Sequence, residues 1–143
     1  MGTIEHAIEI AARAHAGTTD KGGAPYLLHP LRVMFAVEGE TARIVAVLHD
    51  VVEDSSITLE DLKREGFSPE VVAAVDVLTR RPGESRLQAA RRAREHLVAR
   101  QVKLADVADN MDMTRIARPT AQDRARFVEY AEVRELLCSD DDL

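Results

Sequence analysis

The sequence predicts an all-α protein, a compact bundle of seven or eight short helices, on three observations. Apolar residues recur at helical spacing along most of the chain, and no segment shows the period-two alternation of a half-buried strand. Several Ser and Thr residues stand where their side chains would cap helices. The composition is rich in Ala, Leu, Glu and Arg and lacks Trp, which favours helices and leaves the core to aliphatic side chains.

The first two helices are expected on either side of a loop. One spans about residues 3–16, because Ile4 and Ile8 share a face and Gly17 can end the helix. The loop that follows is rich in Gly and Pro and cannot continue a helix. Pro30 suits a first turn, so the second helix is expected from there to about residue 38.

The remaining helices are placed by their capping residues. Thr41 is expected to cap a third, mostly apolar helix that continues to about residue 53. Thr58 and Ser68 have the form of two further helix starts, and Ser85 opens a capping box. The last two helices are expected at about residues 102–114 and 120–137.

Length and charge limit the classes of function. The 143 residues fit one domain, expected at 1–137 with a short acidic tail at 138–143. A net charge of −6 argues against DNA or RNA as partner, because such proteins carry a basic surface. No stretch approaches the roughly 18 apolar residues of a membrane span, and no signal peptide is evident. With its single cysteine, the chain is expected to be cytoplasmic with no membrane partner.

Two polar interruptions break the apolar pattern. His49 and Asp50 lie in the third predicted helix, where burial of ionisable groups requires partners or a metal. One turn further on are the carboxyl groups of Glu53 and Asp54. Asp106 lies among small apolar residues, and a helix would place Asn110 on the same face. Each residue alone is more often a hydrogen-bonded core residue than a functional one, so the argument depends on their combination.

Five blocks in a fixed order form a more specific signal. They are AHAG at 14–17, KGGAPYLLHPLRV at 21–33, LHDVVED at 48–54, LT at 78–79, and VKLAD at 102–106 with Asn110. Together they resemble the HD-domain metallophosphohydrolases, and among these the alarmone (guanosine tetraphosphate) hydrolase domain of the RelA/SpoT type. The resemblance covers most of the chain and implies an all-helical bundle. Because no room remains after Leu137 for a synthetase domain, it implies a small stand-alone hydrolase.

The resemblance also implies a metal site and a catalytic pair. The implied ligands of a divalent metal ion are His29, His49, Asp50 and Asp106. The family usually holds manganese, although two imidazoles and two carboxylates would also accept zinc or iron. Glu53 and Asp54 would orient and deprotonate the attacking water or supply a proton to the leaving group.

The resemblance further assigns residues to a small nucleotide substrate. Lys21, Tyr26 and Asn110 match family positions near the nucleotide. Arg80 and Arg81 are candidates for the distal phosphate from their charge alone. The implied reaction is metal-dependent hydrolysis of guanosine 3′,5′-bis(diphosphate), ppGpp, to GDP and pyrophosphate.

Two alternatives stay open, and the sequence leaves the oligomeric state undetermined. The family usually has a basic pair where this chain has Asp20-Lys21. The segment between Thr79 and Lys103 is also shorter than in the long bifunctional enzymes of the family. These departures favour an HD-type phosphohydrolase that acts on another nucleotide or phosphoester. The other alternative is a non-catalytic nucleotide-binding helical domain. Such a domain has no evident need for the additional carboxyl groups of Glu53 and Asp54 beside bound phosphate.

Overall fold

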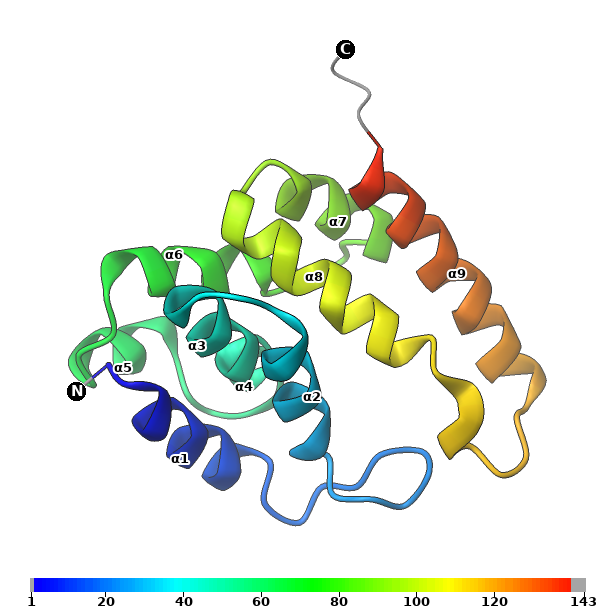
Figure 1. Ribbon diagram of the computed structural model, residues 1–143, viewed down its shortest axis with the longest axis horizontal. Helices are drawn as coiled ribbons and strands as arrows, with labels where there is room; N and C mark the ends of the chain where they lie inside the picture. The colour runs from blue at the N-terminus through cyan, green and yellow to red at the C-terminus, as the bar shows by residue number, and fades with distance from the viewer. Residues whose placement is uncertain (1, 140–143) are drawn as a thin grey trace.

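The computed structural model describes residues 2–139, and these residues form helices, turns and loops without a strand. The predicted all-α bundle is confirmed (Figure 1). Its helices are α1 (Ile4–Ala14), α2 (Leu28–Ala36), α3 (Glu40–Leu48), α4 (Val51–Asp54), α5 (Leu59–Arg64), α6 (Pro69–Leu78), α7 (Arg86–Arg94), α8 (Leu97–Asn110) and α9 (Ala121–Cys138), with a 3₁₀ turn at Met113–Arg115.

Several of these helices begin at the side-chain caps that the sequence predicts. Thr58, Ser85 and Thr120 form capping boxes, in which the hydroxyl accepts from the backbone three residues on and the side chain there accepts from the cap. Ser68 caps α6 in the simpler way. The prediction for Thr41 is wrong, because the chain turns into α3 at Gly39. Gly39 has φ of 92°, a left-handed conformation that glycine adopts without steric cost.

Two helices begin earlier than the sequence indicates. α2 starts at Leu28, so Pro30 lies in the first turn, where a missing N–H breaks no helical hydrogen bond. α8 starts at Leu97 because the ring of His96 accepts from the N–H of Ala99, a cap that a search for Ser, Thr, Asp and Asn misses.

The predicted third helix is interrupted at the residues of greatest interest. α3 ends at Leu48, and the chain passes through His49 and Asp50 before α4 begins. On a continuous helix these two neighbours would diverge by about 100°. The turn instead brings His49 Nε2 within 3.2 Å of Asp50 Oδ1. The interruption therefore aims both side chains at one point.

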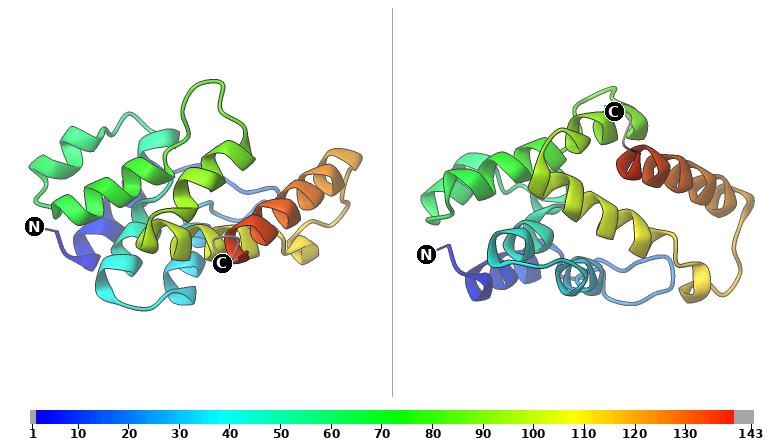
Figure 2. Two further views of the ribbon diagram at one scale, coloured as in Figure 1. Left: turned by 90° about the horizontal axis from the view of Figure 1, so that it is seen from above. Right: turned by 45° about the horizontal axis from the view of Figure 1, so that its top comes forward.

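Helix α8 occupies the centre of the molecule. It packs against α2, α3 and α6 on one side and against α7 and α9 on the other, as Figure 2 shows. Val102 of α8 belongs to the larger hydrophobic core and Val107 to the smaller one. Between these two faces runs a polar stripe of Lys103, Asp106 and Asn110 at helical spacing. The stripe places Asp106, only 4% exposed, between the two cores.

The loop between α1 and α2 is held in place from several sides. Thr19 and Pro25 form an isolated antiparallel bridge, and Asp20 Oδ1 accepts from two backbone N–H groups within the loop. Gly22 packs so closely that a Cβ there would overlap the carbonyl oxygen of Arg115. Lys21 forms an ion pair with Asp123 of α9. The loop is thus fixed against the far end of the bundle.

At the C-terminus, α9 continues to Cys138, and residues 140–143 of the expected acidic tail lie outside the described residues. None of the helices in the described part of the chain combines the length and apolar character needed to span a membrane.

Leu48→Ala should destabilise the fold by about 2–5 kcal/mol, because it opens a cavity beneath the site. Leu48 is 0% exposed in the larger core, directly before His49. Leu97→Ala is the matched control, since Leu97 is 86% exposed, and its effect should stay within about 0.5 kcal/mol. Urea unfolding of both variants measures the difference, and equal losses would contradict this description of the core.

Candidate metal centre and active site

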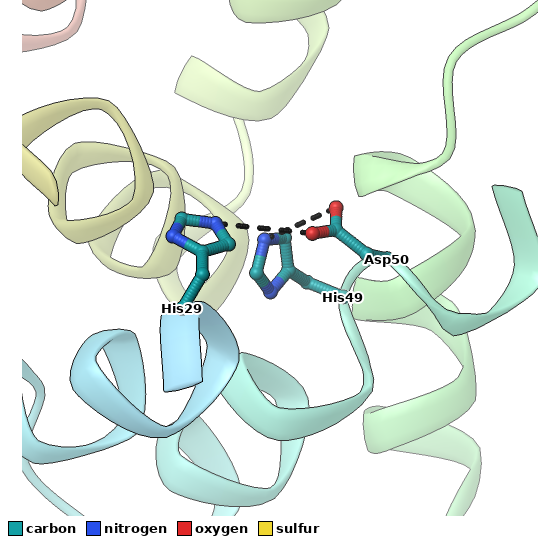
Figure 3. A group of neighbouring side chains, drawn as sticks. All are labelled: His29, His49 and Asp50. Carbon is teal, nitrogen blue, oxygen red and sulfur yellow. Dashed lines mark ion pairs between the residues drawn. The ribbon is translucent and has the colours of Figure 1, made fainter. Parts of the chain in front are cut away.

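Three potential metal ligands converge from different elements. His29 comes from the first turn of α2, and His49 and Asp50 come from the break between α3 and α4 (Figure 3). One ligand atom from each lies within 4.8 Å of the other two. The Nε2 atoms of His29 and His49 lie 3.8 Å and 3.2 Å from the Asp50 carboxylate oxygens. The residues thus share one small volume.

Asp106 joins this group from α8. Its Oδ1 lies 2.9 Å from His29 Nε2 and 3.4 Å from His49 Nε2. Burial alone would raise the pKa of Asp106, but the ammonium of Lys103, 2.9 Å away, and the imidazole of His49 hold it well below its ordinary value. The structure thus brings together all four predicted ligands, called here the His–Asp cluster: His29, His49, Asp50 and Asp106.

The donor set of the His–Asp cluster fits a divalent cation. His49 Nδ1 is 2.6 Å from the carbonyl oxygen of Ala46, which can only accept, so the proton is on Nδ1. His49 Nε2 is buried without a hydrogen-bond partner in the described residues and faces the oxygens of Asp50 and Asp106. A cation held between this nitrogen and the two carboxylates would contact all three groups. Two imidazoles and two carboxylates suit a first-row divalent ion.

Three residues that the sequence reasoning did not assign support this cluster. Asp109 accepts from His29 Nδ1 at 2.7 Å, and Arg32 in turn donates to Asp109. Lys103 contacts Asp106. The available signal was spacing, because Asp109 and Lys103 each lie three residues from Asp106, and Arg32 lies three residues from His29.

A cavity of about 310 Å³ opens above the cluster and is called here the cluster cavity. Its polar lining includes Tyr26, His49, Asp50, Glu53, Asp54, Arg80, Arg86, Lys103, Asp106, Asn110 and Tyr130. Both predicted catalytic carboxyl groups therefore face it. Glu53 Oε1 accepts from the backbone N–H of Arg80 at 3.0 Å. Desolvation, then the negative charges of Asp50 and Glu53, raise the pKa of Asp54 to about 6.

The predicted nucleotide contacts divide between this cavity and a second one. The loop cavity, of about 290 Å³, is lined by the α1–α2 loop, the 3₁₀ turn and α9. Tyr26 and Asn110 line both cavities. Lys21 lines only the loop cavity, where it pairs with Asp123. The structure thus places Lys21 away from the His–Asp cluster.

The two candidate arginines also separate. Arg80 lines the cluster cavity. Arg81 pairs with Asp76 at 3.1 Å and is not part of either cavity lining. Of these two arginines, only Arg80 is therefore placed to meet a phosphate near the cluster.

Tyr26→Phe should weaken the site modestly, because the Tyr26 hydroxyl donates to Asp50 Oδ2. Burial and the Asp50 carboxylate raise the pKa of Tyr26, so this hydroxyl keeps its proton. Loss of a hydrogen bond to a charged group should cost about 1.5–3 kcal/mol in urea unfolding of the metal-free protein. Tyr130→Phe is the control, because the contact of Tyr130 with Arg86 is made by the aromatic ring, which Phe keeps. Equal stability of the Tyr26 variant and wild type would show that this hydrogen bond does not stabilise the protein.

The helical bundle and its buried His and Asp residues define a class. A family model described as the HD domain matches residues 7–138. The chain belongs to the HD domain family.

The most informative relatives carry a more particular name. The chain is 31% identical over 122 residues to the Drosophila melanogaster guanosine-3′,5′-bis(diphosphate) 3′-pyrophosphohydrolase MESH1. This match covers 78% of the chain and 68% of that protein. It is 34% identical over 82 residues to the guanosine-3′,5′-bis(diphosphate) 3′-pyrophosphohydrolase of Borreliella burgdorferi. This match covers 54% of the chain and 12% of that protein.

One solved structure and several longer relatives are also similar to this chain. A solved structure described as a metazoan ortholog of SpoT that hydrolyses ppGpp superposes with a TM-score of 0.76 at 25% identity, covering 94% of this chain and 84% of that one. Longer relatives include a probable GTP pyrophosphokinase of Mycobacterium leprae, 39% identical over 84 residues, or 56% of this chain. The chain spans about a tenth of the first curated relatives it matches.

Proposed function

We propose that this protein is a metal-dependent phosphohydrolase that converts ppGpp to GDP and pyrophosphate. The observation that carries the proposal is the convergence of His29, His49, Asp50 and Asp106 beneath a cavity that Glu53 and Asp54 also line. The relatives from fly and Borreliella, both named for this reaction, support the choice of substrate.

The His–Asp cluster would hold one divalent ion, which we propose to be manganese from the resemblance to RelA/SpoT-type hydrolases. When bound, such an ion lowers the pKa of a water ligand and offsets charge on the phosphoryl group. His49 would present the lone pair of Nε2, since its Nδ1 proton is committed to the backbone. Lys103 would keep Asp106 ionised through their 2.9 Å contact.

Glu53 and Asp54 would handle the protons of the reaction. Glu53 is held in place by the N–H of Arg80, so its other carboxylate oxygen remains available to orient and deprotonate water. Asp54, with a pKa of about 6, can take up and release a proton near neutral pH. The two are neighbours in the sequence and line the same cavity, and the charge of Glu53 is one of the causes that raise the pKa of Asp54.

The two cavities suggest how a nucleotide would lie. The 3′-diphosphate would enter the cluster cavity, where Arg80, Arg86 and Lys103 supply positive charge. The nucleoside would extend past Tyr26 and Asn110, which line both cavities, into the loop cavity. This arrangement keeps the reacting phosphate at the cluster. The net charge of −6 supports a small nucleotide rather than DNA or RNA, and the single cysteine suits a cytoplasmic enzyme.

A second candidate substrate is a different nucleotide, which Asp20 favours. Asp20 lines the loop cavity, where its negative charge replaces the basic residue expected of an alarmone hydrolase. Its Oδ1 already accepts from the N–H groups of Gly22 and Ala24, which supports a role in shaping the loop. Because these contacts explain the presence of Asp20 without reference to the substrate, ppGpp stays the first choice.

A substrate panel tests the proposal. The manganese-loaded protein is incubated with ppGpp, its adenine counterpart, GTP and a simple 5′-monophosphate, and the products are separated by ion-exchange chromatography. Conversion of ppGpp to equal amounts of GDP and pyrophosphate is expected. Turnover confined to another substrate would support a phosphohydrolase activity and exclude ppGpp as its substrate. No turnover of any substrate by metal-loaded protein would favour the nucleotide-binding alternative.

A further inference from the structure

A charged pair lies directly behind His29, on the side away from the cluster cavity. The Asp109 carboxylate accepts from His29 Nδ1 at 2.7 Å. Arg32 donates two hydrogen bonds to the same carboxylate, Nε to Oδ1 at 2.7 Å and Nη2 to Oδ2 at 3.0 Å. Arg115 adds a contact from the 3₁₀ turn, donating to the Asp109 carbonyl at 2.9 Å. Asp109 is therefore fixed by three residues from two parts of the chain, α2 and the 3₁₀ turn.

These contacts determine which nitrogen of His29 carries its proton when the other nitrogen binds a cation. The Asp109 carboxylate receives two hydrogen bonds from the Arg32 guanidinium, and as a carboxylate it only accepts. The shared proton then belongs to His29 Nδ1. His29 Nε2 is left to face Asp50 and Asp106.

The two histidines of the cluster differ in this respect. His49 Nδ1 donates to a neutral backbone carbonyl of its own helix, an acceptor that no substitution removes. His29 Nδ1 donates to a carboxylate from a different helix, 80 residues along the chain. A carboxylate acceptor makes an imidazole a stronger metal donor and fixes its ring orientation. His29 is thus the histidine whose position depends on another side chain.

We propose that Asp109, clamped by Arg32, is a positioning residue that orients His29 with Nε2 toward the metal and strengthens it as a ligand. This inference rests on the metal site of the proposed function. Arg32 acts one step further away, because its bidentate contact sets the plane of the Asp109 carboxylate.

The experiment compares wild type with Asp109→Asn, Asp109→Ala and Arg32→Lys. Glu60→Gln is the control, because it also removes one carboxylate charge, but from an exposed pair with Lys63 on α5. Metal-stripped proteins are titrated with manganese and with zinc to obtain Kd. The zinc-loaded proteins, which are diamagnetic, are then studied by ¹⁵N NMR of the histidine rings.

The Kd of Asp109→Asn for both metals should rise about 10–100-fold, and that of Asp109→Ala at least as much. Arg32→Lys keeps the charge but loses the two-point grip, so its Kd should lie between those of wild type and Asp109→Asn. In zinc-loaded wild type, His29 should show a protonated, slowly exchanging Nδ1–H far downfield. In Asp109→Asn this resonance should move upfield and exchange faster, while the ring signals of His49 stay unchanged.

A Kd within twofold of wild type for Asp109→Asn, with the His29 Nδ1–H resonance unmoved, would overturn the inference while the metal site stands. If wild type binds neither metal, the proposed metal site fails, and the inference fails with it. Thermal unfolding of the metal-free variants separates a positioning role from a general loss of structure. Equal losses of stability and metal affinity in Glu60→Gln would also count against the inference.

Discussion

Asp106→Ala is expected to abolish both bound metal and turnover. Asp106 Oδ1 faces His29 Nε2 and His49 Nε2, and its other oxygen accepts from Lys103. Removal of this carboxylate takes away a ligand and leaves the partly buried Lys103 ammonium without this partner. Loss of the several kcal/mol that a bound metal supplies to the transition state corresponds to a fall in kcat/KM of about 10³-fold or more.

Elemental analysis after dialysis and a ppGpp hydrolysis assay on the same sample provide the measurement. Because a buried unpaired charge can cost about 3–5 kcal/mol of stability, Asp106→Asn is prepared alongside. The amide keeps the volume and can still accept from Lys103, so this variant should remain folded and still lose metal. A folded Asp106→Asn protein with wild-type metal content would exclude Asp106 from the ligand set.

Glu53→Gln should separate catalysis from metal binding. Its amide oxygen can still accept from the N–H of Arg80, so the side chain should keep its position. It can no longer take a proton, and kcat should fall about 10²–10⁴-fold, the usual contribution of a general acid or base. Metal content and Tm should stay at the wild-type values.

The control for Glu53→Gln is Glu70→Gln, the same substitution on an exposed position of α6 outside both cavity linings. Its kcat should match wild type. Undiminished turnover in Glu53→Gln would remove the acid–base assignment, and the same measurement on Asp54→Asn would then decide whether Asp54 acts alone.

The sequence predicts those parts of the fold that depend on local patterns. The helix starts at Thr58 and Thr120 and the capping box at Ser85 are confirmed, because a cap depends only on residues three apart. The break after Leu48 escapes prediction, since apolar residues continue across it on both sides. There the burial of His49 and Asp50 in a common site outweighs the helical periodicity.

The site shows the same division between local and distant information. All four proposed ligands were predicted because each stands in a recognisable block, and the fold brings those blocks together. Asp109 was not assigned, because its role depends on His29 and Arg32, which lie about 80 positions earlier. Lys21 was predicted to lie near the nucleotide, and the structure adds its contact with Asp123, 102 residues away, which no spacing could reveal.

Metal titration of the stripped protein shows whether hydrolysis of ppGpp depends on an ion bound at the His–Asp cluster. Manganese is added in steps, and bound ion and ppGpp turnover are measured on the same samples. We expect negligible turnover without metal and turnover that rises in proportion to bound ion, with GDP and pyrophosphate as products. Full turnover by the stripped protein, or saturated metal sites with no hydrolysis of ppGpp, would contradict this expectation.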